Sequence, residues 1–153
     1  MSIDFKALNK KVDLKGLQED IKEVKENGGT GDFKEVPTGA TYEVGLEKME
    51  LGLSKKGDPM VIIWWNILEG EFKNSKIFQY QVITRGFQIH IINEFLRSLG
   101  TSIEVEFEDY EQYNDLLLDI AEEIEAEGLE YALAYGQNSK GFNTYKIEEI
   151  FES

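Results

Sequence analysis

A central stretch of the chain is rich in apolar and aromatic side chains and predicts two long β-strands joined by a short polar turn. Residues 60–68 are β-branched, aromatic or apolar except for Asn66, and a proline and a glycine bound them. Successive side chains of a strand point to opposite faces, so Trp64 and Trp65 lie on different sides of it. Because one core cannot hold both rings unless the strand is buried on both faces, we expect at least one tryptophan to have a role outside the core.

The flanking sequence predicts further strands and two helices. The apolar period of residues 40–53 shifts beside Gly45 or Lys48, which predicts a bulge in a long, bent strand. The first expected helix has an apolar stripe made of Phe87, Ile91, Ile92, Phe95, Leu96 and Leu99. The second begins at Asp109, which together with Gln112 resembles a capping box. The other predicted elements are strands at 71–84, 129–135 and 142–151 and a short extended piece at 103–107.

The N-terminal residues 1–35 are predicted to form a helical arm and a linker that precede a domain at residues 36–153. Steps of three and four mark one face of a helix at Leu14, Leu17, Ile21 and Val24, and the glycine-rich connector Gly28–Gly31 follows it. We expect this helix to pack on the domain or on a partner. Contact with a neighbouring subunit is the alternative.

The order of the predicted elements is three strands, a helical insertion and two more strands. A five-stranded sheet with its main helix between the third and fourth strands is the order of the OB-fold, a small, partly open Greek-key barrel. The sequence therefore predicts a mainly β fold with helices, of the α+β class, in which the N-terminal helix precedes an OB-fold barrel. Such a fold binds its ligand on strands two and three, between the turn joining strands one and two and the turn joining strands four and five.

The distribution of charge changes what the total charge implies. A net charge of -14 argues against binding to nucleic acid, which is a polyanion. Most of the excess lies in residues 100–127, which contain eleven acidic groups and no basic one, whereas residues 39–99 contain seven of each. We interpret the acidic segment as a solvated helix face. Contact with a partner, or repulsion of phosphate from the back of the barrel, is the alternative.

Aromatic and basic residues meet on the predicted ligand face, which is typical of single-strand binding. An exposed aromatic ring stacks on any base, and lysines bind the phosphates. We therefore assign Trp65 to the core and Trp64 to a stacking surface; packing of Trp64 and Phe78 beneath the N-terminal helix is the alternative. The predicted DNA-binding residues are Lys55, Lys56, Trp64, Asn66, Lys73, Lys76, Phe78, Tyr80, Arg85, Asn138, Lys140 and Phe142.

Several runs of the chain resemble a family of phage-encoded single-stranded DNA-binding proteins, found in phages and prophages of Gram-positive bacteria. The resemblance extends from about Phe5 to Phe151, and its runs are 36–44, 54–60, 67–73, 86–90, 93–99 and 141–146. It implies an OB-fold protein that coats single-stranded DNA during phage replication and recombination, in the cytoplasm of the bacterial host.

Phage recombinase or replication proteins are the further partners that this resemblance implies. Many single-strand binders recruit such proteins through an acidic C-terminal tail, and residues 146–153 are acidic with a phenylalanine near the end. These residues also alternate like a strand and lack a flexible spacer, so a strand is the other interpretation. The sequence leaves open whether the chain forms a homo-oligomer.

No motif in the sequence points to catalysis. Glu104, Glu106, Glu108 and Asp109 have the carboxylates of a two-metal nuclease, but such a run without a nearby lysine or histidine is typical of an exposed surface. The sequence also lacks glycine-rich phosphate loops, nucleophile elbows and metal-ligand spacings. We therefore expect a non-enzymatic protein with no cofactor, no metal and no membrane contact. The alternative function is an OB-fold adaptor that binds a protein partner in a phage replication or recombination complex.

Overall fold

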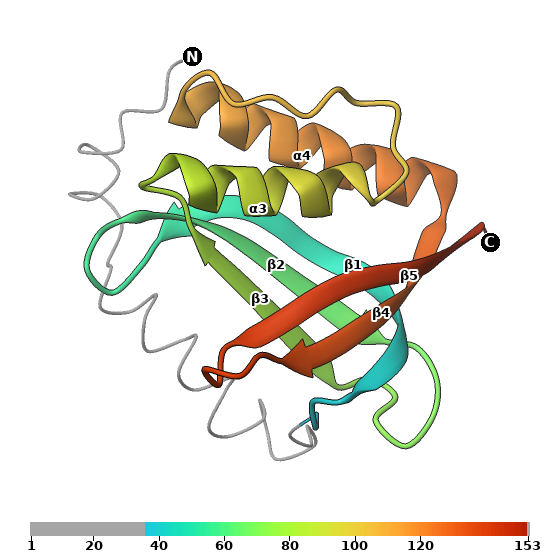
Figure 1. The fold of residues 1–153 in the computed structure, drawn as a ribbon. Helices are drawn as coiled ribbons and strands as arrows, with labels where there is room; N and C mark the ends of the chain where they lie inside the picture. The colour runs from blue at the N-terminus through green and yellow to red at the C-terminus, as the bar shows by residue number, and fades with distance from the viewer. Residues whose placement is uncertain (1–35, 153) are drawn as a thin grey trace.

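The computed structural model describes residues 36–152, which form an antiparallel sheet covered on one side by two helices (Figure 1). The predicted N-terminal arm at residues 1–35, and with it the idea that the arm covers Trp64, lies outside the described residues. The elements are β1 (Ala40–Leu53), β2 (Pro59–Ile67), β3 (Lys76–Val82), α3 (Gly86–Arg97), α4 (Tyr110–Glu127), β4 (Leu129–Gln137) and β5 (Asn143–Glu152).

The five strands form one open sheet in the order β3-β2-β1-β4-β5. The predicted mainly β fold of the α+β class is thus confirmed. The sheet does not close, and β3 and β5 are its two edges. The long strand β1 joins the two halves, because its first half pairs with β4 and its second half pairs only with β2. The predicted bulge lies between Leu46 and Lys48, and it bends β1 where this change of partners occurs.

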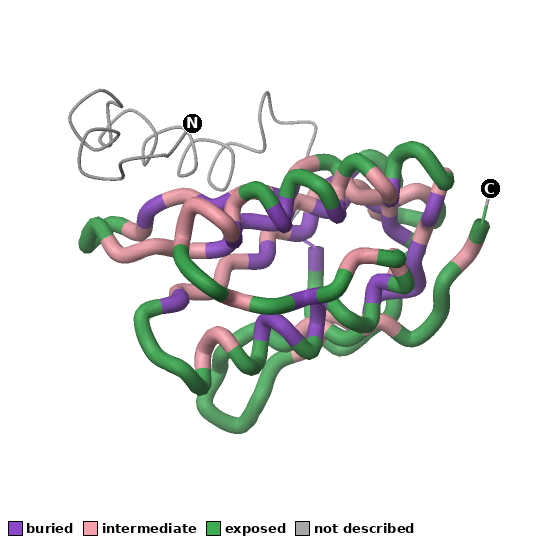
Figure 2. The backbone as a smooth tube through the Cα atoms, turned by 90° about the horizontal axis from the view of Figure 1, so that it is seen from above, coloured by how far each residue is buried: buried purple, intermediate pink, exposed green. Residues whose placement is uncertain are grey.

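Trp65 is at the centre of the core, as predicted. Its side chain is 0 % exposed, and its ring packs edge-on against Phe95 of α3 and Tyr131 of β4. Its indole Nε1 donates a hydrogen bond of 2.9 Å to Oε1 of Gln79, so both buried polar groups are satisfied. Figure 2 shows the helical turns alternating between buried and exposed positions, as expected for helices with one face on a core.

The predicted start of α4 is confirmed by its N-cap. The carboxylate of Asp109 accepts a 2.7 Å hydrogen bond from the backbone N–H of Gln112, and Gly128 ends the helix with a left-handed φ of 63°. From its inner face, Asn114 Oδ1 accepts a 3.1 Å hydrogen bond from the Leu51 N–H of β1. This bond satisfies part of the β1 edge that has no partner strand.

Part of the predicted apolar stripe of α3 is wrong. Phe87 is 60 % exposed and Ile91 is 54 % exposed, whereas Ile92, Phe95, Leu96 and Leu99 are buried. At 3.6 residues per turn, Phe87 and Ile91 lie on a stripe of their own, turned by roughly 100° or more from Ile92. The helix therefore buries the narrower stripe and leaves two large apolar side chains in solvent.

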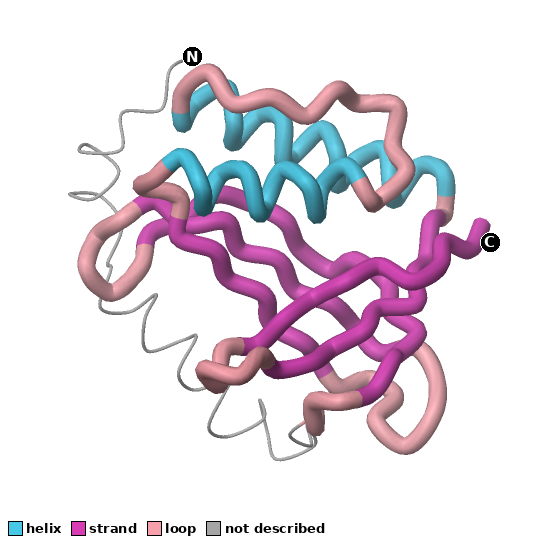
Figure 3. The backbone as a smooth tube through the Cα atoms, in the orientation of Figure 1, coloured by secondary structure: helices cyan, strands magenta, loops and turns pink. Residues whose placement is uncertain are grey.

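The extended pieces predicted beside the helices and before β3 also differ from the structure. Residues 103–107 form no strand; they belong to the loop that connects α3 to α4 (Figure 3). Their backbone carbonyls bond to side chains instead, since Arg97 donates to Val105 O at 2.8 Å and Gln112 donates to Glu106 O at 3.0 Å. The strand predicted at 71–84 begins only at Lys76, because residues 71–74 form the turn after β2.

Replacing Trp65 with alanine tests its place in the core. We expect the free energy of unfolding to fall by about 3–5 kcal/mol, because the change leaves a cavity and also removes the partner of Gln79. Urea unfolding followed by far-UV circular dichroism measures this loss, with Trp64→Ala as the matched control on the opposite face. A loss below about 1 kcal/mol for Trp65→Ala would contradict the assignment.

Candidate nucleic-acid interface

The side of β2 and β3 that faces away from the helices carries a row of three aromatic rings, which we call the aromatic row: Trp64, Phe78 and Tyr80. Trp64 pairs with Phe78 across the strands, and their rings meet edge-on with centroids 5.3 Å apart. The rings of Phe78 and Tyr80 are stacked in parallel, with an interplanar angle of 6°. All three side chains are intermediate in exposure, so they are neither core residues nor fully open.

Lys48 covers the ring of Trp64, which the sequence did not indicate. Its Nζ lies 4.5 Å from the ring centroid and forms a 2.8 Å ion pair with Glu50. Such a cation–π contact contributes about 0.5–1 kcal/mol at an exposed site. A planar ligand that stacks on this face of Trp64 must first displace Lys48 from the ring.

Two of the predicted binding residues, Asn66 and Lys76, are hydrogen-bonded to each other. Nζ of Lys76 donates to Oδ1 of Asn66 at 3.0 Å and forms a 2.8 Å ion pair with Glu47. Glu47 is the extra residue of the β1 bulge, and a bulge redirects its side chains relative to the regular pleat. The charge of Lys76 is therefore neutralised by a group that alternation alone does not place on this face.

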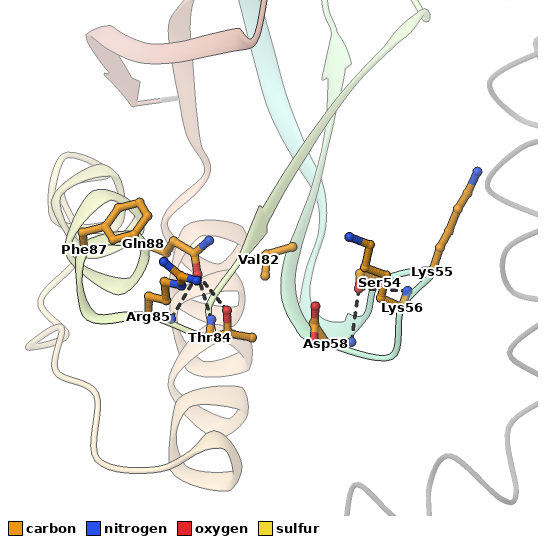
Figure 4. Close-up of a pocket in the computed structure, with 9 residues that line it drawn as sticks. All are labelled: Ser54, Lys55, Lys56, Asp58, Val82, Thr84, Arg85, Phe87 and Gln88. Carbon is orange, nitrogen blue, oxygen red and sulfur yellow. Dashed lines mark hydrogen bonds between the residues drawn. The ribbon is translucent and has the colours of Figure 1, made fainter.

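A hollow of about 620 Å³ opens at the end of the sheet where β1 turns into β2 and β3 leads into α3 (Figure 4). Its lining residues are Ser54, Lys55, Lys56, Asp58, Val82, Thr84, Arg85, Phe87 and Gln88. The structure thus brings the predicted residues Lys55, Lys56 and Arg85 to one site, although the Lys55 side chain points away from the opposite wall. Sequence reasoning missed Phe87, because its helical spacing had assigned it to the core.

The β4–β5 turn carries three more predicted residues, Asn138, Lys140 and Phe142. The turn is ordered by Oδ1 of Asn138, which accepts hydrogen bonds from the backbone N–H groups of Lys140 at 2.9 Å and Phe142 at 3.0 Å. Phe142 is 67 % exposed at the end of the turn, where its carbonyl accepts a 2.9 Å hydrogen bond from the Asn138 N–H. This turn precedes Tyr145, whose hydroxyl donates a 2.6 Å hydrogen bond to the Phe78 carbonyl across the open side of the sheet.

The remaining predicted residue, Lys73, does not join these clusters. It is exposed in the β2–β3 turn, at the end of the sheet opposite the hollow. The acidic run Glu104, Glu106 and Glu108 is also exposed, in the loop before α4. The twelve predicted residues therefore divide into the aromatic row with Asn66 and Lys76, the hollow, the β4–β5 turn, and Lys73 alone.

These features define a mainly antiparallel α+β domain with an aromatic sheet face between two polar turns. The chain belongs to the family described as "Protein of unknown function (DUF669)", which matches residues 21–137. The match includes the aromatic row and the hollow and ends before Lys140 and β5. A comparison with curated proteins finds no match for this chain. Within residues 36–152, no helix has the length and apolar character needed to cross a membrane.

The hydroxyl of Tyr145 supplies a pH-dependent test of the contact between β5 and β3. Burial raises the pKa of Tyr145 above its ordinary value, and nearby Tyr135 adds to this effect. From about pH 10 upward an unfolded tyrosine loses its proton while the folded Tyr145 keeps it. The unfolded state then binds fewer protons, so the free energy of unfolding must fall as the pH rises.

We predict that Tyr145→Phe makes this fall shallower, by at most about 1.4 kcal/mol per pH unit, because one proton no longer contributes. The variant should also lose about 0.5–1.5 kcal/mol near neutral pH, since it lacks the hydrogen bond to Phe78. Urea unfolding between about pH 8 and about pH 11 measures both effects. Equal slopes for the variant and the parent would contradict the raised pKa.

Proposed function

We propose that this protein binds single-stranded DNA without strong sequence preference and acts as a coat rather than as an enzyme. The order of its elements and the sheet order β3-β2-β1-β4-β5 support an OB-fold arrangement, which is a partly open five-stranded Greek-key barrel. The helices follow β3 and precede β4, where such a fold has its helical insertion. The bond from Tyr145 to Phe78 spans the open side between the edge strands.

The observation that carries the proposal is the aromatic row on β2 and β3. Three adjacent rings on a sheet face are the stacking surface that a base needs, and every base offers a π-face whatever its identity. In the OB-fold this face lies between the β1–β2 and β4–β5 turns. Here those turns carry Lys55, Lys56 and Lys140, which can follow the phosphates on either side of the row.

The placement of the acidic groups is compatible with a polyanionic ligand. Eleven of the acids lie in residues 100–127, in α4 and the loop before it. The helix packs with its buried residues on the core side of the sheet, opposite the aromatic row. Low-dielectric core and sheet therefore separate the acidic helix from the proposed DNA, and the charge repels phosphate mainly from the back of the molecule.

The resemblance to phage single-stranded DNA-binding proteins supplies the biological setting of the proposal. In that setting the protein acts in phage replication and recombination, in the cytoplasm of the bacterial host, with phage recombinase or replication proteins as further partners. A second candidate function, a protein adaptor, is favoured by the exposed apolar side chains of Phe87, Ile91 and Phe142. Phe87 and Ile91 lie four residues apart on one side of α3, and exposed apolar side chains grouped in this way are typical of protein contacts.

A fluorescence titration with an oligothymidine separates these two functions. Trp65 is buried, so quenching by DNA reports on Trp64. If Lys55, Lys56, Arg85 and Lys140 each contact a phosphate, log K falls with log salt with a slope of about -3. A folded sample that shows no change at low salt would rule out the DNA-binding proposal and leave the adaptor.

We predict that Trp64→Ala weakens oligothymidine binding by roughly 5- to 150-fold, the equivalent of about 1–3 kcal/mol for one stacked base. Fluorescence anisotropy of a labelled oligonucleotide measures the affinity independently of the tryptophan signal. Trp64→Phe is the matched control, since a smaller ring still stacks and should retain most of the binding. An alanine variant that binds like the parent would exclude Trp64 from the interface.

We predict that Glu47→Gln strengthens binding at low salt by about two- to fivefold, because Lys76 loses its ion-pair partner and can contact phosphate. The salt slope should become steeper by about 0.7 for the added contact. Glu94→Gln is the control, because it removes the same charge from an ion pair with Arg97 on α3. Equal effects of the two variants would show that only net charge matters.

A further inference from the structure

We infer that the hollow between the β1–β2 turn and the start of α3 is a nucleotide subsite, in which Lys56 and Arg85 bind a phosphate and Phe87 stacks on the adjacent base. This inference rests on the proposed function and extends the binding surface beyond strands β2 and β3. The hollow has a volume of about 620 Å³. Pockets of about 300–1,000 Å³ hold ligands of this size class, so there is room for one nucleotide.

Both walls of the hollow are held in place by short-range hydrogen bonds. In the β1–β2 turn, Oγ of Ser54 accepts from the backbone N–H of Lys56 at 3.3 Å and of Asp58 at 3.1 Å. In the opposite wall, Oε1 of Gln88 accepts from the backbone N–H groups of Thr84 at 2.9 Å and Arg85 at 3.0 Å. These bonds fix the backbone from which the cationic side chains extend, so a ligand need not order the turns.

The charge of the hollow is opposite to that of the protein. Its lining contains Lys55, Lys56 and Arg85 against a single acid, Asp58, in a chain with a net charge of -14. Among the described residues, neither Lys56 nor Arg85 has an ion-pair partner, whereas Lys48, Lys76 and Arg97 all have one. Two cations on facing walls that form no ion pair with the described residues are suited to an anion such as a phosphate.

Phe87 supplies the apolar part of the site. Its ring is 60 % exposed in the first turn of α3 and lines the same hollow as the two cations. Covering the face of an exposed phenyl ring is energetically favourable, and any nucleobase can do so by stacking on it. A phosphate-binding pair beside an open aromatic ring fits a nucleotide better than it fits a purely apolar protein segment.

The hollow is continuous with the aromatic row. Phe78, Tyr80 and Val82 alternate along the outward side of β3, and Val82 lines the hollow. At about 3.3 Å per residue, the four-residue step from Phe78 to Val82 covers roughly 13 Å. A strand of DNA that stacks on Phe78 and Tyr80 and continues along β3 therefore reaches the hollow.

Anisotropy titrations with oligothymidines of increasing length test the subsite in the full chain. We expect Phe87→Ala to lower the affinity for long oligomers at least about fivefold and to leave the shortest binding oligomer unaffected. Arg85→Ala and Lys56→Ala should each reduce the salt slope by about 0.7. Ile91→Ala and Lys146→Ala are the controls, since they remove an exposed apolar side chain of α3 and an exposed cation of β5.

The outcomes separate the subsite from the proposed function. If Trp64→Ala weakens binding as expected while Phe87→Ala and Arg85→Ala bind all lengths like the parent, the subsite is wrong and the DNA-binding face stands. Losses as large for Ile91→Ala as for Phe87→Ala would also overturn it. A parent protein that binds no oligothymidine at low salt would overturn both. Because the substituted side chains other than Trp64 are exposed and Trp64 lies outside the core, circular dichroism should show the parent fold for each variant.

Discussion

The register of β2 against β3 is the constraint on which the rest of the molecule depends. A slip of one residue would turn every side chain of a strand to the opposite face. Trp65 and Gln79 oppose such a slip, because their 2.9 Å hydrogen bond lies inside the core. A change of register would break this bond and leave both buried polar groups unpaired. With Trp65 held inward, Trp64 must point outward beside Phe78. One buried polar contact thus determines the composition of the opposite sheet face.

The parts of the fold that could be predicted are those encoded by neighbouring residues. Alternation located the strands, the Asp109 cap located the start of α4, and the shift in period located the β1 bulge. The predictions that were wrong concern segments whose conformation depends on residues that are near them in space but not in sequence. Residues 103–107 alternate like a strand, but the carbonyls of Val105 and Glu106 accept hydrogen bonds from the side chains of Arg97 and Gln112. The pattern of apolar and polar residues in one segment cannot show that side chains outside the segment will form its backbone hydrogen bonds.

The same distinction applies to the candidate site. Trp64, Phe78 and Tyr80 follow from the face of one strand pair, so sequence reasoning could place them together. The groups that modify them, Lys48 and Glu47, come from β1, and their positions depend on how the bulge redirects the chain. The hollow required two junctions, β1–β2 and β3–α3, to meet in space. Its cations were recognisable from composition, but their common location was not.

Positive charge is unevenly distributed over the face that contains the aromatic row and the hollow: within residues 36–152, it is neutralised at the centre and less so at the end. At the centre, Lys48 and Lys76 are each paired with a glutamate, so the aromatic row is close to neutral. Lys56 and Arg85 remain without ion pairs among the described residues at one end of β3. In the proposed complex, the neutral aromatic centre would supply stacking, while Lys56 and Arg85 at the end would contact phosphates that stay partly hydrated. If the protein binds DNA as proposed, affinity from stacking comes from β2 and β3, whereas affinity from charge comes from the β1–β2 turn and the start of α3. The two contributions should therefore respond separately to salt.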